Sequence, residues 1–503
     1  MGMFVRRKPN KSGLVSVQVI DKRTGSYKVI KTIGSSSDHD EIERLVNQAN
    51  RYIQTQQGSQ EIDFSDHRSL YSEVLSSVRS LRLVGVEFVL GRIFDEIGFR
   101  AVEDPLFRDL VLYRLVYPRS KLKTIQYLFR YENKSYTEDD VYRYMDKLYD
   151  KQKELVQQIS YRHTLDILSG RIHAVFYDVT TLYFEIEQED ELRKPGFSKE
   201  GKHQNPQILL GLLVSKDAYP LAYDIFEGKK FEGDTLLPVL DAFRERYGIE
   251  KVTVVADAGL LSKANVEGLR ARGYEFILGA RIKNERTETR NRILGLNLRN
   301  GESRSIHKGD DRLIITYSED RARKDRYNRE RGIAKLEKRI GSDSLTKSSI
   351  NNKGYNKFLS LEGDLIVSID RQKAEEDAQW DGLKGYLTNS PLDDREILEN
   401  YAHLWQIEKA FRVAKGELRI RPVFHYKRRR IEAHICLNFV AYKVYKELER
   451  RLKEWKTEIS PETVIEIIQN IYEISVVTPN NELIKKTLIL TEEQRIIQRL
   501  FNF

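Results

Sequence analysis

The run "RIHAVFYDVTTLYFE" (residues 171–185) is rich in β-branched and aromatic residues, a composition typical of a buried β-strand. The runs "QILLGLLVSKD" (207–217) and "YPLAYDIFEG" (219–228) predict two further strands. After them the pattern alternates between helix and strand, with a helix predicted over 233–248, a strand over 251–257, a helix over 262–273 and a strand over 274–282. This order predicts a mixed α/β sheet.

An acidic residue interrupts the first strand, and a second one ends a later strand. Asp178 stands among residues suited to burial, and Asp257 follows five β-forming residues in "VTVVADAGLL". A buried, unpaired carboxylate costs several kcal/mol, so such an acid normally needs a cation or a metal ion. Either acid alone has an ordinary alternative, because a strand-end Asp is often a helix cap or a turn residue.

The segment "YAHLWQIEKAFRVAK" (401–415) has the period of an amphipathic helix. Four residues recur on one stripe at i, i+4, i+7 and i+11, namely Leu404, Glu408, Phe411 and Lys415. A helix normally turns such a stripe inward, so we expect Glu408 to face inward and to complete a site with Asp178 and Asp257.

These three carboxylates predict a metal site. Oxygen ligands without His or Cys at zinc spacing suit Mg²⁺ or Mn²⁺. Two such ions, held roughly 3.5–4 Å apart, activate a water or a hydroxyl and steady the leaving oxygen of a phosphodiester. We therefore expect two ions and phosphoryl-transfer chemistry.

The three acid-bearing segments resemble those of insertion-sequence DDE transposases with a ribonuclease H-like core. The resemblance covers roughly residues 171–450, and it is to the subgroup that carries a β-strand-rich insertion before the Glu. It implies that Asp178, Asp257 and Glu408 are the catalytic, metal-binding residues of an α/β, ribonuclease H-like fold.

Members of this subgroup share a signature in which Tyr, Arg, Glu and Lys are separated by two, three and six residues. Tyr401, Glu408 and Lys415 match it, whereas Leu404 stands at the Arg position. The phosphate contact of that Arg is lost, and Arg412 or Lys409 could supply the positive charge instead. The resemblance thus implies DNA contacts by four residues: Tyr401, Lys409, Arg412 and Lys415.

Two further basic segments are candidate DNA contacts. The loop within "PGFSKEGKHQNPQILLGLL" resembles the corresponding basic loop of these transposases, and a charged hairpin connection is the alternative. Its cations are Lys199, Lys202 and His203. The segment "HYKRRR" (425–430) is a plausible phosphate clamp, with Lys427, Arg428 and Arg429.

Pattern and charge predict six parts along the chain. These are a basic β-hairpin arm with a linker helix (1–55), a helical DNA-binding domain (56–170), the core's first part (171–285), an inserted β-rich subdomain (286–377), the core's second part (378–456) and a C-terminal helical tail (457–503). Basic residues on the short helices, including Arg114 and Lys121, could form a helix-turn-helix reader. Ordinary surface charge on a packing domain is the alternative.

Composition limits the partners and the compartment. The 503 residues include 85 Lys and Arg against 76 Asp and Glu, a net charge of +9, which favours a polyanionic partner. The single cysteine, Cys436, excludes an internal disulfide framework. The sequence has no apolar run of about 18 residues, and its N-terminus turns basic before a signal core could form. We expect a bacterial or archaeal protein of the cytoplasm, associated with DNA and not with a membrane.

Taken together, these patterns and the resemblance predict that the protein is a DNA transposase. It would bind its element's terminal inverted repeats in double-stranded DNA, hydrolyse the ends and join the 3′ hydroxyls to target DNA. Synapsis of two ends implies a homodimer. The alternatives are a nuclease or resolvase of the same fold that does not join strands, and a domesticated DNA-binding protein that does not cleave.

Overall fold

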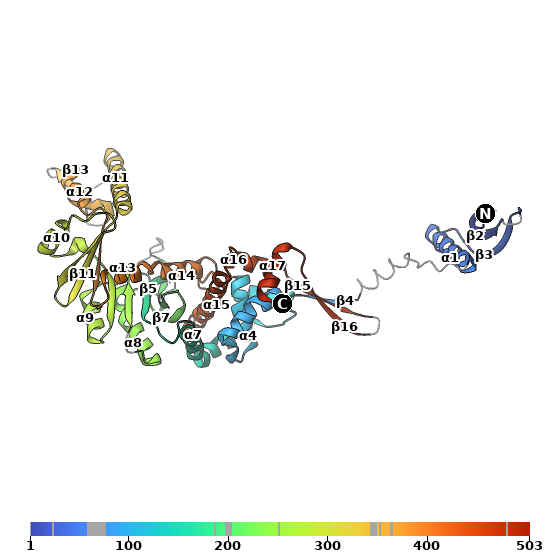
Figure 1. The fold of residues 1–503 in the computed structure, drawn as a ribbon, viewed down its shortest axis with the longest axis horizontal. Helices are drawn as coiled ribbons and strands as arrows, with labels where there is room; N and C mark the ends of the chain where they lie inside the picture. The colour runs from blue at the N-terminus through green and yellow to red at the C-terminus, as the bar shows by residue number, and fades with distance from the viewer. Residues whose placement is uncertain are drawn as a thin grey trace. The chain divides into compact units, whose positions relative to one another are not determined.

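The computed structural model describes residues 2–22, 25–57, 77–185, 188–196, 204–249, 252–342, 350–351, 354–362, 366–478 and 481–503. The chain divides into two compact units, Met1–Ser80 with Ser475–Lys485 and Leu81–Ile474 with Lys486–Phe503 (Figure 1). The larger unit contains all three acids. Among the described residues, no helix has the length and apolar character needed to cross a membrane.

The N-terminal segment of the smaller unit is a sheet backed by a helix. The sheet has the order β1-β2-β3, and its antiparallel strands are β1 (Met3–Pro9), β2 (Val15–Asp21) and β3 (Lys28–Ser36). Strands β2 and β3 form the hairpin predicted for residues 13–34, and β1 was not predicted. Helix α1 (His39–Gln57) covers the sheet through Ile42, Ala49 and Ile53, which pack against Val17 and Val19.

The larger unit is built on a mixed sheet, which has eight strands within the described residues. Its order is β10 (Ser303–Lys308), β11 (Asp311–Tyr317), β14 (Leu383–Thr388), β9 (Glu275–Ala280), β8 (Thr253–Ala256), β5 (Ala174–Tyr183), β6 (Gln207–Ser215) and β7 (Pro220–Glu227). Only the pairs β5–β8 and β8–β9 are parallel. The predicted mixed α/β sheet is confirmed.

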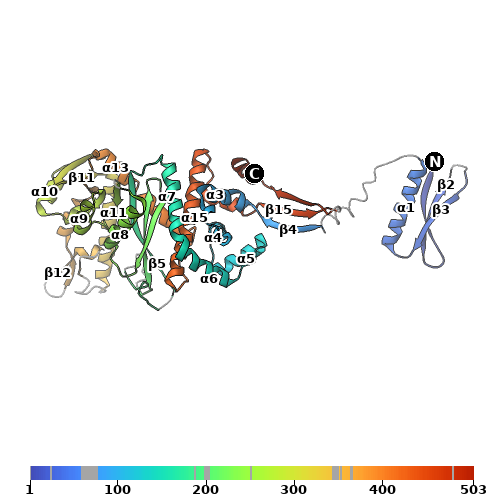
Figure 2. The same ribbon diagram turned by 90° about the horizontal axis from the view of Figure 1, so that it is seen from below.

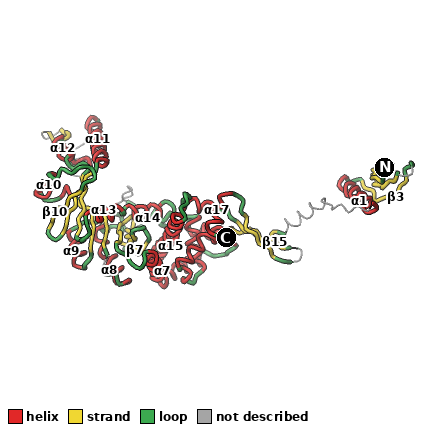
Figure 3. The backbone as a smooth tube through the Cα atoms, viewed as in Figure 1, coloured by secondary structure: helices red, strands yellow, loops and turns green. Residues whose placement is uncertain are grey.

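Helices cover both faces of this sheet (Figures 1 and 3). Helices α8 (Leu236–Tyr247) and α9 (Lys263–Ala271) pack on one face, in a core that includes Val175, Tyr177 and Val254. Helices α13 (Asp394–Ala402) and α14 (Trp405–Lys415) pack on the other, in a core that includes Phe176 and Val255. The strand segments predicted from sequence thus alternate between two cores.

Residues 81–170 are mainly helical and share the second core. Their helices are α3 (Arg92–Ile97), α4 (Pro105–Val116), α5 (Lys121–Glu132), α6 (Glu138–Lys147) and α7 (Lys153–Ile167). A capping box formed by Thr137 and Asp140 begins α6. The long helix α15 (Arg428–Glu454) packs against α4, α6 and α7 of this group and runs beside α7 (Figure 2), and both α7 and α15 contact β7 of the sheet.

The insertion before Glu408 is not a self-contained β-rich subdomain, because β10 and β11 extend the main sheet. Its other elements are α10 (Thr287–Leu294), α11 (Glu319–Gly341), β12 (Leu359–Glu362), β13 (Ile366–Ile369) and α12 (Arg371–Ala378). A small separate core forms around Leu336, Phe358 and Leu359. Helix α11 is long and rich in Lys and Arg.

Two helical predictions were wrong in part. Strand β4 (Val78–Leu83) lies where helix was expected, and the C-terminal tail contains β15 (Tyr472–Val477) and β16 (Leu483–Leu488) between α16 (Pro461–Ile468) and α17 (Glu492–Phe501). These strands form a sheet in the order β16-β15-β4. Their short alternating runs become strands because a partner distant in sequence completes the backbone hydrogen bonds.

A buried ion-pair network fastens α15 to the sheet. The Glu447 carboxylate, 1% exposed, accepts hydrogen bonds from the Tyr219 hydroxyl at 2.8 Å, from Arg450 at 2.6 Å and from Arg451 at 3.0 Å. Burial raises the pKa of Glu447, but the bonds from the two arginines outweigh it and bring the pKa to about 2. This carboxylate is therefore ionised in the folded protein at any ordinary pH.

We expect Glu447→Gln to lower the free energy of unfolding by about 3 kcal/mol, because it leaves two arginines without their buried partner. The folded pKa lies below the unfolded value of about 4.3, so this stabilisation is complete above pH 4.3 and is lost as the pH falls through 2. Denaturant unfolding at pH 7 and at pH 2.5 measures both effects. Glu454→Gln, which removes an exposed ion pair on the same helix, should change stability by less than about 0.5 kcal/mol.

Candidate active site

The register of two neighbouring strands places two of the acids side by side. Strands β5 and β8 pair in parallel up to Tyr177, which lies opposite Ala256. The next positions in the same register are Asp178 and Asp257. Because paired strands lie about 4.8 Å apart, the two backbones hold these residues as neighbours at the carboxyl end of β8.

Both acids belong to the same face of the sheet. Side chains alternate between faces along a strand, so Asp178 shares the face of Phe176. By the same rule Asp257 shares the face of Val255. Phe176 and Val255 lie in the core formed with α13 and α14. The two carboxylates therefore belong to the side of the sheet that carries Glu408.

Asp257 also organises the turn after β8. Its Oδ1 accepts hydrogen bonds from the backbone N–H groups of Gly259 at 2.9 Å and Leu260 at 3.3 Å. Asp257 therefore does act as a turn residue, and both of these hydrogen bonds use the same carboxylate oxygen. Asp178 Oδ1 accepts a bond of 2.7 Å from the backbone N–H of Val179. Both acids are half-buried, which leaves them within reach of solvent.

Glu408 does not face inward as the helical wheel predicts. A turn at residues 403–404 separates α13 from α14, and the buried side of α14 consists of Ile407, Ala410, Phe411 and Val413. Glu408 lies beside this stripe and is exposed. The wheel misplaced it because Leu404 and Phe411 mark the edge of the buried stripe and not its centre.

The buried Tyr401 is influenced by the charges of both Glu408 and Asp257. Burial raises the pKa of Tyr401, and the negative charges of Asp257 and Glu408 raise it further. Tyr401 of α13 thus lies within electrostatic range of both acids. Its hydroxyl sits so close to Gly279 of β9 that a Cβ there would come within 2.6 Å.

Lys384 of β14 is a site residue that the sequence did not reveal. Its Nζ lies 4.5 Å from the ring centroid of Tyr401 and 5.1 Å from that of Tyr386. Burial lowers the pKa of Lys384, and so does the positive charge of Arg321, whereas Glu408 acts in the opposite direction. The available signal was a lysine inside the apolar strand "GLKGYLTN".

The donor atoms suit a hard divalent ion, but no finished cage is present. Asp178, Asp257 and Glu408 offer only carboxylate oxygens, the ligands that Mg²⁺ and Mn²⁺ prefer. Within the described ranges, no three His, Cys, Asp or Glu side chains converge closely enough to hold an ion. The two aspartates are the neighbouring pair, and the exposed Glu408 would have to turn toward them.

The predicted DNA contacts differ in their freedom to bind. Lys409 forms an ion pair with Glu449 of α15, Arg412 is exposed and Lys415 is half-buried. At the start of α15, three exposed cations follow one another, namely Lys427, Arg428 and Arg429. Arg428 pairs with Glu432 at 3.0 Å. The predicted loop contacts Lys199, Lys202 and His203 lie outside the described residues.

Comparison with known proteins identifies the family of this chain. A family model described as a transposase DDE domain matches residues 169–443, more than half of the 503-residue chain. Among solved structures, the chain is similar to a chain from a synaptic complex of piggyBac transposase with hairpin DNA, with 7% sequence identity, a TM-score of 0.38 and 76% of each chain covered. No curated protein matches.

The matched residues contain both aspartate strands and the helix that carries Glu408. The chain therefore belongs to the family of transposases with a DDE domain.

Proposed function

We propose that this transposase binds the terminal inverted repeats of its element, hydrolyses the ends and joins the 3′ hydroxyls to target DNA. Asp178, Asp257 and Glu408 are the proposed catalytic residues of a ribonuclease H-like core. The observation that carries the proposal is the parallel register of β5 and β8, which makes the two aspartates neighbours beneath the helix layer that carries Glu408.

The three carboxylates are the proposed ligands of two Mg²⁺ or Mn²⁺ ions. When bound, such ions activate a water or a hydroxyl and stabilise charge on the leaving oxygen. The chain's part is to hold the ligands. The hydrogen bonds from Gly259 and Leu260 orient the Asp257 carboxylate, and the exposed position of Glu408 leaves it able to approach a bound phosphodiester.

Cations around the acids would position the DNA. Lys384 of β14 lies within electrostatic range of Glu408, and Arg321 of α11 lies within range of Lys384. Arg412 is exposed on the same helix as Glu408, and the exposed cations at the start of α15 add the positive end of a helix dipole. In this arrangement Tyr401 is a positioning residue, since it packs between the carboxylates and β9. A homodimer would bring two element ends together.

We expect Lys384→Met to slow DNA cleavage about tenfold, because the ammonium group beside Glu408 stabilises negative charge that collects at the reacting phosphate. Single-turnover cleavage of end-bearing DNA measures the change. Lys373→Met is the matched control, since Lys373 is an exposed lysine of α12 paired with Asp370. An equal loss in both variants would count against a role for Lys384 in the site.

The experiment that tests the function uses linear DNA with the element's terminal repeats, a supercoiled plasmid target and Mg²⁺. A transposase yields cut ends and joined target products, and both require the divalent ion. Cut ends without joined products would instead identify a nuclease of the same fold. Binding of the repeats without cleavage by the wild-type protein would overturn the catalytic proposal.

A further inference from the structure

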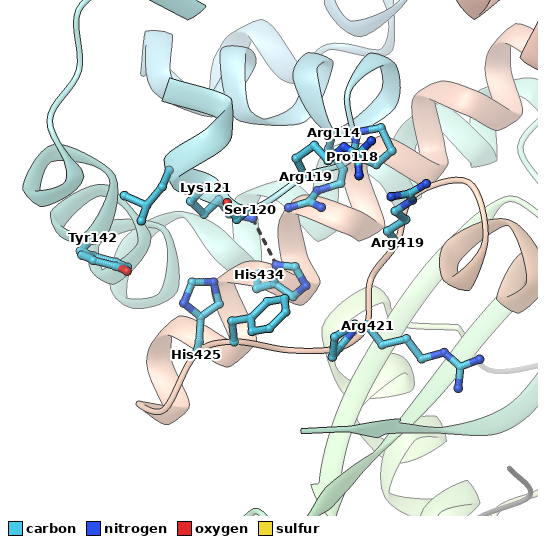
Figure 4. A pocket seen from close by; sticks show the side chains of 13 residues that line it. Arg114, Pro118, Arg119, Ser120, Lys121, Tyr142, Arg419, Arg421, His425 and His434 are labelled. Carbon is cyan, nitrogen blue, oxygen red and sulfur yellow. Dashed lines mark hydrogen bonds between the residues drawn. The ribbon is translucent and has the colours of Figure 1, made fainter. Parts of the chain in front are cut away.

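A pocket outside the proposed active site is lined by cations without an acid among the described residues at its wall. It has a volume of about 330 Å³ and lies between the end of α4, the start of α5 and the segment before α15 (Figure 4). Its basic side chains are Arg114, Arg119, Lys121, Arg419 and Arg421, and His425 and His434 accompany them. The volume is at the lower end for small-ligand sites, so it suits a group of nucleotide size.

Arg114 is the least expected member of this wall. It is 5% exposed, and its guanidinium makes no hydrogen bond or ion pair with any residue in the described ranges. Burial lowers its pKa to about 10. A buried charge without a partner is destabilising, and buried charges are normally paired. Its burial excludes the alternative of ordinary surface charge for this residue.

Lys121 and His434 form a hydrogen-bonded pair beside Arg114. His434 Nε2 lies 2.9 Å from the carbonyl oxygen of Ile420, so Nε2 carries the proton and donates it. His434 Nδ1 must then accept from Lys121 Nζ at 3.2 Å, and Figure 4 shows these two side chains facing each other. The imidazole is neutral and accepts a hydrogen bond from one of the three N–H donors of Lys121. This bond holds the Lys121 side chain, which is 7% exposed, in place.

The N-terminus of α5 adds to the positive potential in the pocket. Lys121 and Leu122 open the twelve-residue helix α5, whose cap is Ser120, so their backbone N–H groups have no partner within the helix. The N-terminus of a helix favours an anion. His425 is neutral and adds no further positive charge, because burial and the nearby basic groups Lys121, Arg114 and Arg430 lower its pKa to about 3.

The pocket also has a defined place relative to the acids. The segment before α15 is tied to the end of β5, where the backbone N–H of Val423 donates to the carbonyl of Tyr183 at 3.4 Å. The Arg421 guanidinium turns away from the pocket toward the Tyr183 ring, at 5.6 Å (Figure 4). Tyr183 lies five residues beyond Asp178 on the same strand, about 16 Å at 3.3 Å per residue.

We propose that this pocket binds a phosphate group of the DNA substrate, beyond the end of β5 and away from the phosphodiester at the acids. The proposal rests on the proposed function, because the DNA is its ligand. Arg114, Lys121 and the start of α5 would hold the phosphate oxygens, and the exposed Phe424 at the pocket wall offers a ring to the attached sugar or base. A free nucleotide or inorganic phosphate has the same chemistry and is a separate arm of the test.

The test compares wild-type protein with Arg114→Met and Arg119→Ala. Thermal unfolding is followed in sodium phosphate, in thymidine 5′-monophosphate and in sodium chloride of equal ionic strength. We expect phosphate and the nucleotide to raise the wild-type melting temperature by several degrees. Arg114→Met should abolish that shift and, because it removes an unpaired buried charge, should raise the melting temperature without ligand. Arg130→Met, a change at an exposed residue of α5 that does not line the pocket, should leave both values unchanged.

The DNA arm separates the possible sources of phosphate. If the ligand is DNA, Arg114→Met weakens binding of end-bearing DNA about tenfold and reduces the slope of log affinity against log salt by about one. A lost phosphate shift with unchanged DNA binding assigns the pocket to a free phosphate compound and overturns the DNA proposal. Equal phosphate shifts in wild type, Arg114→Met and Arg119→Ala, or no shift in any of them, also overturn it.

The same proteins distinguish this failure from failure of the proposed function. Asp257→Asn protein lacks the proposed metal ligand but keeps every residue of the pocket wall. Its phosphate response and DNA affinity should equal those of the wild type. An intact, Arg114-dependent phosphate response in a wild-type protein that never cleaves DNA would support phosphate binding while the catalytic proposal fails.

Discussion

Asp257→Asn should reduce the rate of DNA cleavage by at least about 10³-fold, equivalent to about 4 kcal/mol of transition-state stabilisation. The amide keeps the size of the carboxylate and its acceptor oxygen, so the bonds to Gly259 and Leu260 can persist. What it removes is the negative charge that a divalent ion requires. Asp178→Asn and Glu408→Gln should have effects of the same order if the three residues share the ions.

The measurement is single-turnover cleavage of end-bearing DNA in Mg²⁺, with affinity for the same DNA measured in Ca²⁺. DNA affinity should stay within about twofold, because the proposed DNA contacts are untouched. Asp234→Asn is the control, since Asp234 is an exposed aspartate before α8 and outside the site. Wild-type cleavage by Asp257→Asn would refute the proposed metal role.

The layout of the sheet could be predicted from sequence because its signals are local. The runs around Asp178 and Asp257 are long and strongly β-forming, and the helices between them begin and end with clear patterns. The position of the two acids side by side depends on a relation that these runs do not contain, namely that β5 and β8 are parallel neighbours. The structure supports it through the register that ends at Tyr177 and Ala256.

What escaped prediction depends on contacts between distant segments. The side on which Glu408 lies is set by a turn at residues 403–404, which the period of "YAHLWQIEKAFRVAK" does not show. Strands β10 and β11 join the main sheet through β14, about seventy residues later in the sequence. Arg114 looks like a surface cation in the sequence, and only the packing of α4 against α15 reveals its burial.

Lys384 shows the same limit for the site. A lysine in a strand ordinarily points to solvent, so composition favours a surface interpretation. Its contact with Tyr386, two residues along the same strand, follows from the period of β14. Its contact with Tyr401 depends on the position of α13 beside β14, which sequence spacing does not contain.

A substitution at Gly279, which has no reactive side chain, should slow DNA cleavage almost as strongly as Asp257→Asn does. Gly279 of β9 lies beneath the site, and a Cβ there would come 2.6 Å from the Tyr401 hydroxyl and 2.8 Å from the backbone nitrogen of Ala258. Ala258 follows Asp257 directly, so relief of the second contact must move the Asp257 turn. We expect Gly279→Ala to slow cleavage about 100-fold, as misplacement of a catalytic group by about 1 Å does. Overpacking should also lower the free energy of unfolding by about 1–3 kcal/mol.

The control is Gly341→Ala, because nothing lies within 4 Å of a Cβ built at Gly341 at the end of α11. It should leave cleavage unchanged. Adding Tyr401→Phe to Gly279→Ala removes the hydroxyl contact but not the contact with Ala258. If displacement of the Asp257 turn causes the loss, the double variant should regain stability without regaining cleavage. Recovery of both would show instead that the position of the Tyr401 ring, and not that of the aspartate, controls the rate.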